Sequence, residues 1–194
     1  MVTFDQRSRT VVITGASSGL GRAAAVRFAS RGDNLVLGAR REAALRETAE
    51  ICERAGARTV ALVGDVTREE DVRRLADTAV QTFGGIDVWV NNAGVTLFGS
   101  LEQAPLEEHR RVIEVNLFGA IHGARAALPV FRKQQRGVLI NVGSILSKIG
   151  QPFVPSYVIS KFALRGLSEA LRAEVAPARD IHVCTLLPYA FNTP

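Results

Sequence analysis

A glycine-rich segment near the amino terminus, Thr14–Gly21 (Thr-Gly-Ala-Ser-Ser-Gly-Leu-Gly), constrains the fold more than any other stretch. A β-branched run, residues 10–13, precedes it, and an alanine-rich helical pattern, residues 22–30, follows it. Glycines allow a tight turn, and backbone N–H groups at the start of a helix favour a bound phosphate. A strand, a glycine loop and a helix in this order are typical of a nucleotide-binding unit, although an ordinary strand-to-helix turn is the simpler alternative.

Strand and helix patterns alternate along the rest of the chain. Further buried strands are predicted over residues 34–38, 59–63, 86–90, 137–142 and 181–187. Helices are predicted over residues 42–54, 67–83, 105–134 and 156–176, and Thr67 with Glu70 has the form of a capping box. Such alternation indicates right-handed βαβ units, so we expect an α/β fold with a doubly wound parallel sheet of six strands. No linker or repeat divides the chain, which predicts a single domain over residues 1–194.

Composition excludes several classes of protein. Hydrophobic residues make up 47% of the chain and charged residues 22%, which is ordinary for a globular protein. The net charge is +5, but the basic residues are scattered among acidic ones, so we expect no nucleic-acid partner. No apolar run reaches the roughly 18 residues that span a bilayer, and none resembles a signal peptide, so we expect a cytoplasmic protein without a membrane partner. Cys52, Cys184 and the three histidines show no metal-ligand spacing, and we expect both thiols to be buried.

A tyrosine and a lysine, Tyr157 and Lys161, stand four residues apart near the start of the last long helical pattern. On a helix their side chains share one face. The reference pKa of tyrosine is about 10, and a neighbouring ammonium favours the phenolate and lowers that pKa. The pair is therefore suited to proton transfer, although two surface neighbours would give the same spacing.

Together these segments resemble the short-chain dehydrogenase/reductase family. The fingerprint Thr-Gly-x-x-x-Gly-x-Gly is present as Thr14–Gly21, and Asn-Asn-Ala-Gly as residues 91–94. The family's serine is present as Ser144, and its Tyr-x-x-x-Lys as Tyr157 and Lys161. The resemblance extends from about residue 9 to residue 194. It implies a Rossmann-fold oxidoreductase that uses NAD(P) and acts on a small-molecule carbonyl or secondary alcohol.

The resemblance also implies a role for each of four catalytic residues. Tyr157 would be the general acid or base, and Lys161 would bind the nicotinamide ribose and lower the tyrosine pKa. Ser144 would position the substrate oxygen, and Asn116 would hold a water molecule in a proton relay. Ordinary structural roles are the alternatives, namely a turn cap for Ser144 and a satisfied buried amide for Asn116.

Cofactor choice is expected to be determined after the second strand, where Gly38-Ala39-Arg40-Arg41 contains no acidic residue. Arg40 can fork to the 2′-phosphate of NADP, so NADP(H) is expected over NAD(H), and Arg41 is expected on the solvated start of the next helix. The family often has a second basic residue in the glycine loop, where this chain has serines. For Asp65, an adenine contact and an Asx turn are the alternatives. The cofactor-binding residues implied are Gly15, Ser17, Ser18, Gly19, Leu20, Gly21, Arg40, Asp65, Val66, Asn92, Ala93, Gly94, Tyr157, Lys161 and Pro188.

The family commonly continues beyond the segment that matches residues 188–194, where Tyr189 replaces a usual glycine. We therefore expect a chain truncated at its C-terminus, without the seventh strand and the substrate lid. Residues 145–149 and 152–154 predict an apolar substrate wall. A homodimer or homotetramer is expected through the two long helices, with Phe118, Phe131, Phe162 and Leu167 as candidates and core packing as the alternative for each. An NADPH-binding sensor or scaffold without turnover is the alternative function.

Overall fold

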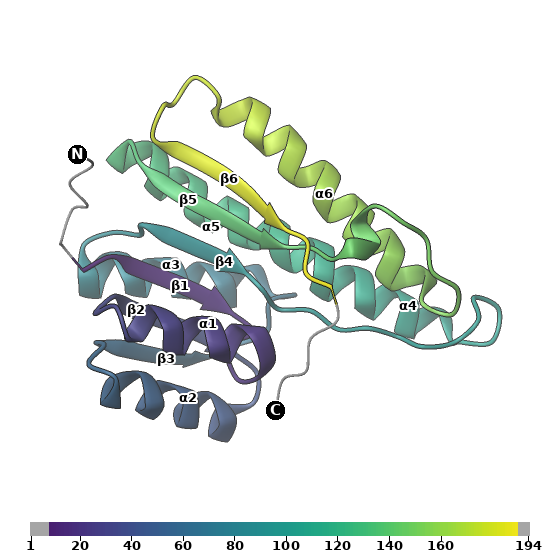
Figure 1. Ribbon diagram of the computed structural model, residues 1–194, viewed down its shortest axis with the longest axis horizontal. Helices are drawn as coiled ribbons and strands as arrows, with labels where there is room; N and C mark the ends of the chain where they lie inside the picture. Colours follow the sequence, from purple (N-terminus) through teal and green to yellow (C-terminus); the bar gives the residue numbers. More distant parts are fainter. Residues whose placement is uncertain (1–7, 190–194) are drawn as a thin grey trace.

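The computed structural model describes residues 8–189 and confirms the doubly wound α/β fold. Six parallel strands form one sheet in the order β3-β2-β1-β4-β5-β6 (Figure 1). They are β1 (Thr10–Thr14), β2 (Asn34–Ala39), β3 (Thr59–Val63), β4 (Val88–Asn91), β5 (Gly137–Val142) and β6 (Ile181–Leu186). The chain winds outward from β1 in one direction and from β4 in the other. The carboxyl ends of these two strands therefore form the crevice where ligands bind in such sheets.

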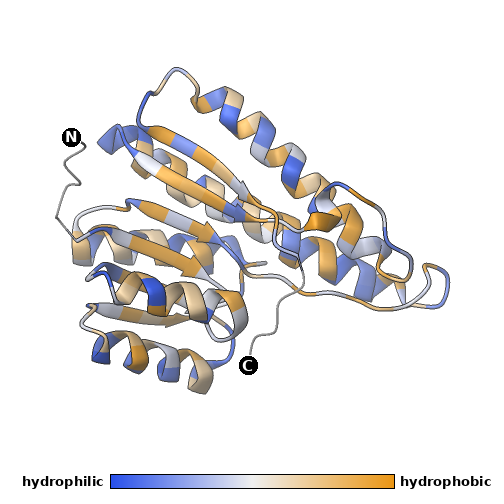
Figure 2. Ribbon diagram, in the orientation of Figure 1, coloured by the Kyte–Doolittle hydropathy of each residue, from blue (hydrophilic) through white to orange (hydrophobic). Residues whose placement is uncertain are grey.

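Helices cover both faces of the sheet and enclose two apolar cores. On one face lie α1 (Gly19–Ala29) and α2 (Glu42–Arg54), and on the other α3 (Glu69–Phe83), α5 (Gly119–Gln134) and α6 (Pro155–Val175). Successive strand residues alternate between the cores, so Val11 and Ile13 pack toward α1 while Val12 packs toward α3. Figure 2 shows the strands as largely hydrophobic and the helices as amphipathic. None of the helices between residues 8 and 189 has the length and apolar character to cross a membrane.

Strand β6 is buried on one face only. Ile181 and Val183 pack into the core beneath α6, whereas His182, Cys184 and Leu186 are exposed on the opposite face. In the described part of the chain no helix lies over that face (Figure 1). The expectation of two buried thiols is therefore confirmed for Cys52 and wrong for Cys184.

The long helix predicted over residues 105–134 is interrupted. It consists of α4 (Leu106–Ile113), a π-helical turn η1 (Glu114–Phe118) and α5. A π turn accommodates one extra residue within a helix and is frequent at functional sites. Asn116 lies in this turn and is 2% exposed.

The predicted capping box at Thr67 is wrong. Helix α3 begins at Glu69, and its N-cap is Arg68, which makes no side-chain cap. The hydroxyl of Thr67 instead donates to Asp65 Oδ1 at 2.9 Å, so it is committed to the turn that precedes the helix. Local competition of this kind is common for threonine near a helix start.

A buried polar network fastens α5 and α6 to the sheet. Trp89 Nε1 donates to Asn91 Oδ1 at 2.8 Å, and Asn91 Nδ2 donates to Asn141 Oδ1 at 2.9 Å and to the Ala120 carbonyl at 3.1 Å. Asn141 Nδ2 then donates to Ser168 Oγ at 2.9 Å. Since every amide in this chain of contacts has a partner, the network stabilises one helix arrangement over others.

Two helical glycines provide a matched test of this packing. A Cβ at Gly123 would overlap Asn91 Oδ1 and stand 2.6 Å from Trp89 Nε1, whereas a Cβ at Gly166 meets nothing within 4 Å. We expect Gly123→Ala to destabilise the fold by about 2 kcal/mol or more, because it breaks the network. Gly166→Ala should stabilise it by about 0.5–1 kcal/mol through helix propensity. Urea unfolding would measure both, and equal effects would contradict this account.

Candidate functional site

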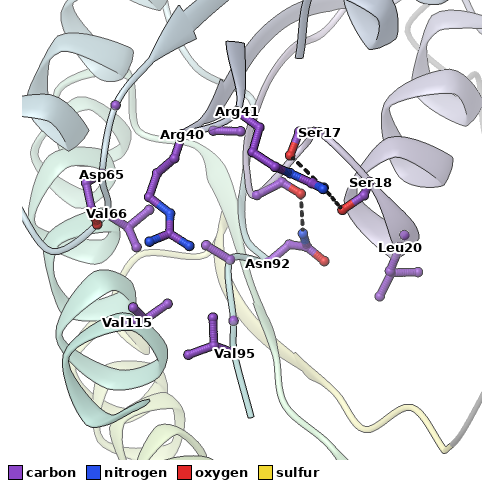
Figure 3. Close-up of a pocket in the computed structure, with 16 residues that line it drawn as sticks. Ser17, Ser18, Leu20, Arg40, Arg41, Asp65, Val66, Asn92, Val95 and Val115 are labelled. Carbon is purple, nitrogen blue, oxygen red and sulfur yellow. Dashed lines mark hydrogen bonds between the residues drawn. The ribbon is translucent and has the colours of Figure 1, made fainter. Parts of the chain in front are cut away.

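A pocket of about 380 Å³ opens at the carboxyl ends of the strands, around the β1–β4 crevice (Figure 3). This volume is typical of small-molecule sites. Most of the expected cofactor residues line it, together with five that sequence reasoning did not assign. The lining residues are Gly15, Ser17, Ser18, Gly19, Leu20, Ala39, Arg40, Arg41, Gly64, Asp65, Val66, Asn92, Ala93, Gly94, Val95 and Val115.

The glycine loop presses against the segment that follows β4. Gly15 has φ of +68°, and a Cβ there would stand 2.7 Å from Ala93 Cα. Asn92 Nδ2 donates to the carbonyls of Thr14 at 3.0 Å and Gly15 at 3.1 Å. A Cβ at Gly21 would overlap Asn92 Nδ2, so Gly21 is required for this close approach although it does not line the pocket.

Helix α1 points its first turn at the pocket. It begins at Gly19, three residues earlier than predicted, and its first turn contains no acidic residue. Its N-cap, Ser18, makes no side-chain cap hydrogen bond. The first-turn N–H groups are therefore available to a negatively charged ligand, which the helix dipole also favours. Hydroxyls, backbone donors and guanidinium groups together fit a phosphate-bearing ligand.

Two consecutive arginines follow β2 and both reach the pocket. The side chain of Arg40 points into it, and Arg41 turns back toward the glycine loop (Figure 3). Arg41 Nη2 donates to Ser18 Oγ at 2.7 Å and lies 3.5 Å from Ser17 Oγ. Arg41 is exposed at the start of α2, as expected, and its long side chain also reaches across to the loop. Only the adjacency of the two arginines signalled this in the sequence.

Asp65 lines the pocket, but its carboxylate is already engaged. Oδ1 accepts from the backbone N–H and the hydroxyl of Thr67, at 3.0 and 2.9 Å, and Oδ2 accepts from Arg111 Nη2 at 2.7 Å. Partial burial raises the pKa of Asp65, but the Thr67 N–H and the Arg111 guanidinium outweigh burial and lower it overall. Asp65 therefore forms the Asx turn that was the structural alternative to an adenine contact.

Asn116 is held beside the chain that leaves β4. Its Oδ1 accepts from the Val95 N–H at 2.8 Å, and its Nδ2 donates to the Val95 carbonyl at 2.9 Å and to Ser160 Oγ at 3.0 Å. The buried amide is satisfied, as the structural alternative predicted. A Cβ at Gly94 would stand 3.4 Å from Asn116 Oδ1 and 3.8 Å from Lys161 Nζ, so the two residues lie close together around Gly94.

Tyr157 and Lys161 share one face of α6, as predicted. Lys161 Nζ lies 5.5 Å from the centroid of the Tyr157 ring and donates to the Val142 carbonyl at 2.7 Å. Lys161 is 4% exposed, and burial lowers its pKa to about 8. Ser160, which sequence reasoning missed, is completely buried and links the helix to the π turn. Its hydroxyl donates to the Tyr157 carbonyl at 2.7 Å and accepts from Asn116.

Ser144 follows β5 and starts a short 3-10 turn, η2 (Ile145–Ser147), which packs against α6. Its Oγ accepts from the Leu146 N–H at 3.2 Å, and its own N–H donates to Ser147 Oγ at 3.2 Å, so it caps the turn. The Pro188 carbonyl accepts from the Ile145 N–H at 3.0 Å, which places Pro188 beside this turn rather than in the pocket. The remainder of the family-like tail, residues 190–194, lies outside the described residues.

Fold and crevice together define a Rossmann-type protein, and comparison with known proteins identifies its family. The family profile for short chain dehydrogenases matches residues 9–194. The chain is 41% identical over 192 residues to 3beta-hydroxysteroid dehydrogenase 1 of Eggerthella lenta, covering 98% of this chain and 73% of that protein. It is 37% identical over 190 residues to the uncharacterized oxidoreductase YxnA of Bacillus subtilis, covering 97% of this chain and 53% of that protein. The chain belongs to the short-chain dehydrogenase family.

Solved structures agree with this assignment. A short chain dehydrogenase/reductase from Burkholderia phymatum in complex with NAD superposes with a TM-score of 0.94 at 33% identity, over 98% of this chain and 69% of that one. An alcohol dehydrogenase from Thermococcus sibiricus, complexed with 5-hydroxy-NADP, gives a TM-score of 0.88 at 33% identity, over 95% and 77% of the two chains. The present chain therefore spans between about half and three quarters of the length of these four proteins.

The buried Lys161 ammonium should make stability depend on pH. The unfolded chain keeps this proton up to about pH 10.5, whereas the folded chain releases it near pH 8, so the unfolded state binds more protons between these values. The free energy of unfolding should therefore rise with pH across this window, by roughly 3 kcal/mol in total. Lys161→Met should remove this rise. Urea unfolding of both proteins at pH 7.5 and 10 would show the difference, and parallel pH profiles would refute the prediction.

Proposed function

We propose that this chain is an NADP(H)-dependent oxidoreductase that interconverts a carbonyl and a secondary alcohol of a small, fairly apolar substrate. The observation on which this rests is at one edge of the sheet, where Gly94 of an arginine-lined pocket lies close to Lys161, and Tyr157 lies beside Lys161. Relatives named as a hydroxysteroid dehydrogenase and an alcohol dehydrogenase support this reaction class. Exposed Ile149 and Phe153 support an apolar substrate wall.

Pocket residues would hold the dinucleotide in a defined order. The glycine loop and the first turn of α1 would bind the pyrophosphate through backbone N–H groups. Arg40, which has no carboxylate partner in the described part of the chain, would bind the 2′-phosphate that distinguishes NADP. Val66, Ala93 and Val115 offer the apolar surface that a base or a ribose requires.

The residues on α6 would move the proton. When bound, the nicotinamide would supply or accept the hydride. Tyr157 would donate its phenolic proton to the carbonyl oxygen, or accept one from the alcohol in the reverse direction. The ammonium of Lys161 would bind the ribose hydroxyls. Ser144 would position the substrate oxygen, because its hydroxyl hydrogen remains available while its oxygen caps the turn.

Removing the tyrosine hydroxyl tests the proposed chemistry. We expect Tyr157→Phe to lower the turnover of a carbonyl panel by about 10²–10⁴-fold, because the general acid is lost. Fluorescence titration should show NADPH affinity unchanged within about twofold, since the pocket does not include this hydroxyl. A large loss of affinity would mean that Tyr157 has another role. NADPH binding without turnover by the unaltered chain would favour a sensor or scaffold instead.

We further propose that the face formed by α4, η1, α5 and α6 mediates homo-oligomerisation. A groove of about 550 Å³ between α4 and α6 is lined by exposed Leu106, Phe118 and Ile159, and Phe162 is also exposed. Of the other two candidates, Phe131 is fully buried in the core and Leu167 packs against it, so the core-packing alternative holds for both.

Sedimentation velocity tests the interface. We expect Phe162→Glu to shift the chain toward a smaller species, because a charge would be buried in an apolar contact. The control is Ala170→Glu, an exposed position on the same helix, eight residues further from the groove residue Ile159 than the neighbouring Phe162 is. Unchanged sedimentation of the Phe162→Glu variant would contradict the proposal.

A further inference from the structure

A buried histidine on α4, His109, joins that helix to the first turn of α6. His109 Nδ1 lies 2.8 Å from Ser156 Oγ, and the two atoms share a hydrogen bond that is shielded from solvent. His109 is 9% exposed and Ser156 is 2% exposed. Because the serine hydroxyl is so deeply buried, it is not presented to a ligand as a nucleophile would be. The bond instead connects two helices.

The second ring nitrogen of His109 has no such partner. Within residues 8–189 no donor or acceptor reaches Nε2, although this atom is buried. A buried polar atom without a hydrogen bond destabilises the folded state, so an apolar side chain of similar volume would pack better at this position. Packing alone therefore does not explain a histidine here, and the bond to Ser156 is the interaction that an apolar residue could not make.

Ser156 directly precedes Tyr157, at a helix start that has no side-chain cap. The N-cap residue of α6, Val154, makes no side-chain cap hydrogen bond. Four residues after Ser156, Ser160 accepts a hydrogen bond from Asn116 Nδ2 at 3.0 Å. Since α4 and the π turn η1 are consecutive, Tyr157 lies between two side-chain hydrogen bonds that fasten α6 to the same neighbouring segment.

The side chain of Tyr157 has no hydrogen bond of its own that would fix its direction. Its ring centroid lies 5.5 Å from Lys161 Nζ, and its hydroxyl makes no hydrogen bond to another residue between 8 and 189. Successive residues of an α-helix are rotated by about 100°, so the direction of Tyr157 follows from the rotation of the turn that Ser156 anchors. A displacement of about 1 Å at a reacting group can lower a rate by about 10²-fold.

We propose that His109 is a positioning residue for Tyr157. Through Ser156 it fixes the first turn of α6, and with it the direction in which Tyr157 presents its hydroxyl. This inference rests on the proposed function, in which Tyr157 is the general acid or base, and adds a residue that orients it. His109 lines the groove between α4 and α6 and does not line the pocket, so it acts through the helix and not on the reacting atoms.

Two substitutions of His109 separate the hydrogen bond from the packing. Asparagine has a polar atom two bonds from Cβ, as histidine has at Nδ1, so His109→Asn can keep the bond to Ser156 although it leaves a small void. Leucine fills a similar volume without a polar atom, so His109→Leu removes the bond together with the unpartnered nitrogen. We therefore expect a lower urea midpoint for His109→Asn than for His109→Leu.

Turnover should follow the opposite order. The measurement uses NADPH and the carbonyl of the panel that the unaltered chain reduces fastest. We expect His109→Leu to lower kcat about tenfold and His109→Asn to keep it within about twofold, with KM for the carbonyl changed less than about twofold in both. The control is Val112→Ala, which truncates another buried residue of α4 and should lower the urea midpoint without lowering kcat. A kcat that follows the urea midpoints, or equal losses in both His109 variants, would overturn the positioning role.

A double-mutant cycle tests whether His109 acts through Ser156. Ser156→Ala should lower kcat about as much as His109→Leu does, and the variant with both changes should lose no more than either alone. Additive losses would show that the two residues act independently and would contradict the proposed connection.

Fluorine NMR tests the inference without turnover and separates its failure from that of the proposed function. The chain has two tyrosines, so labelling with 3-fluorotyrosine gives two signals, and Tyr189→Phe identifies the signal of Tyr157. His109→Leu should shift or broaden this signal, whereas in His109→Asn, which removes the same ring, it should stay near its original position.

The two readouts have distinct outcomes. If the unaltered chain reduces no carbonyl but the fluorine signals change as expected, the proposed function fails and His109 still positions Tyr157. A Tyr157 signal that is the same in His109→Leu and in the unaltered chain would overturn the inference, whether or not the chain turns over.

Discussion

The contact between the glycine loop and the end of β4 is the constraint on which the rest of the site depends. Thr14 Oγ1 donates to the Val90 carbonyl at 3.3 Å and accepts from the N–H groups of Asn92 and Ala93, at 3.1 and 3.2 Å. The side-chain amide of Asn92 in turn donates to the carbonyls of Thr14 and Gly15 in the glycine loop. These bonds join the strands where the winding direction reverses, so they set the position of α1 relative to the β4 segment. Glycine is needed at Gly15 because this approach leaves no space for a side chain.

Periodicity was sufficient to predict the six strands, their parallel arrangement and the edge of the sheet where the pocket lies. These features follow from apolar runs and helix lengths, which are local properties of the chain. The π turn could not be predicted in this way. The segments before and after it each have an ordinary helical pattern, so residues 105–134 look like one uninterrupted helix in the sequence. The false cap at Thr67 arose from a real local motif, but Asp65 offered the same hydroxyl a closer partner.

The residues of the candidate site show why structural and functional readings need not exclude each other. Ser144 caps a turn, Asn116 is a satisfied amide and Asp65 forms an Asx turn, as their structural alternatives predicted. In each case the structural bonds fix the side chain at the edge of the sheet where chemistry is proposed. Ser160 and Arg41 escaped sequence reasoning for another reason. Their partners lie 44 and 23 residues away in sequence, so only the fold brings them together.

The π turn has a further consequence for how one helix serves two neighbours. An extra residue rotates everything that follows it by about 100° around the helix axis. The apolar side of α4 therefore faces α6, whereas that of α5 faces α3 and the strands β4 and β5. The π turn thus rotates the apolar side of α5 relative to that of α4, although the two helices form one continuous segment. Asn116 lies in this turn, between the part of the helix that packs on α6 and the part that packs on α3 and the sheet. Packing on both sides therefore fixes the position of its amide.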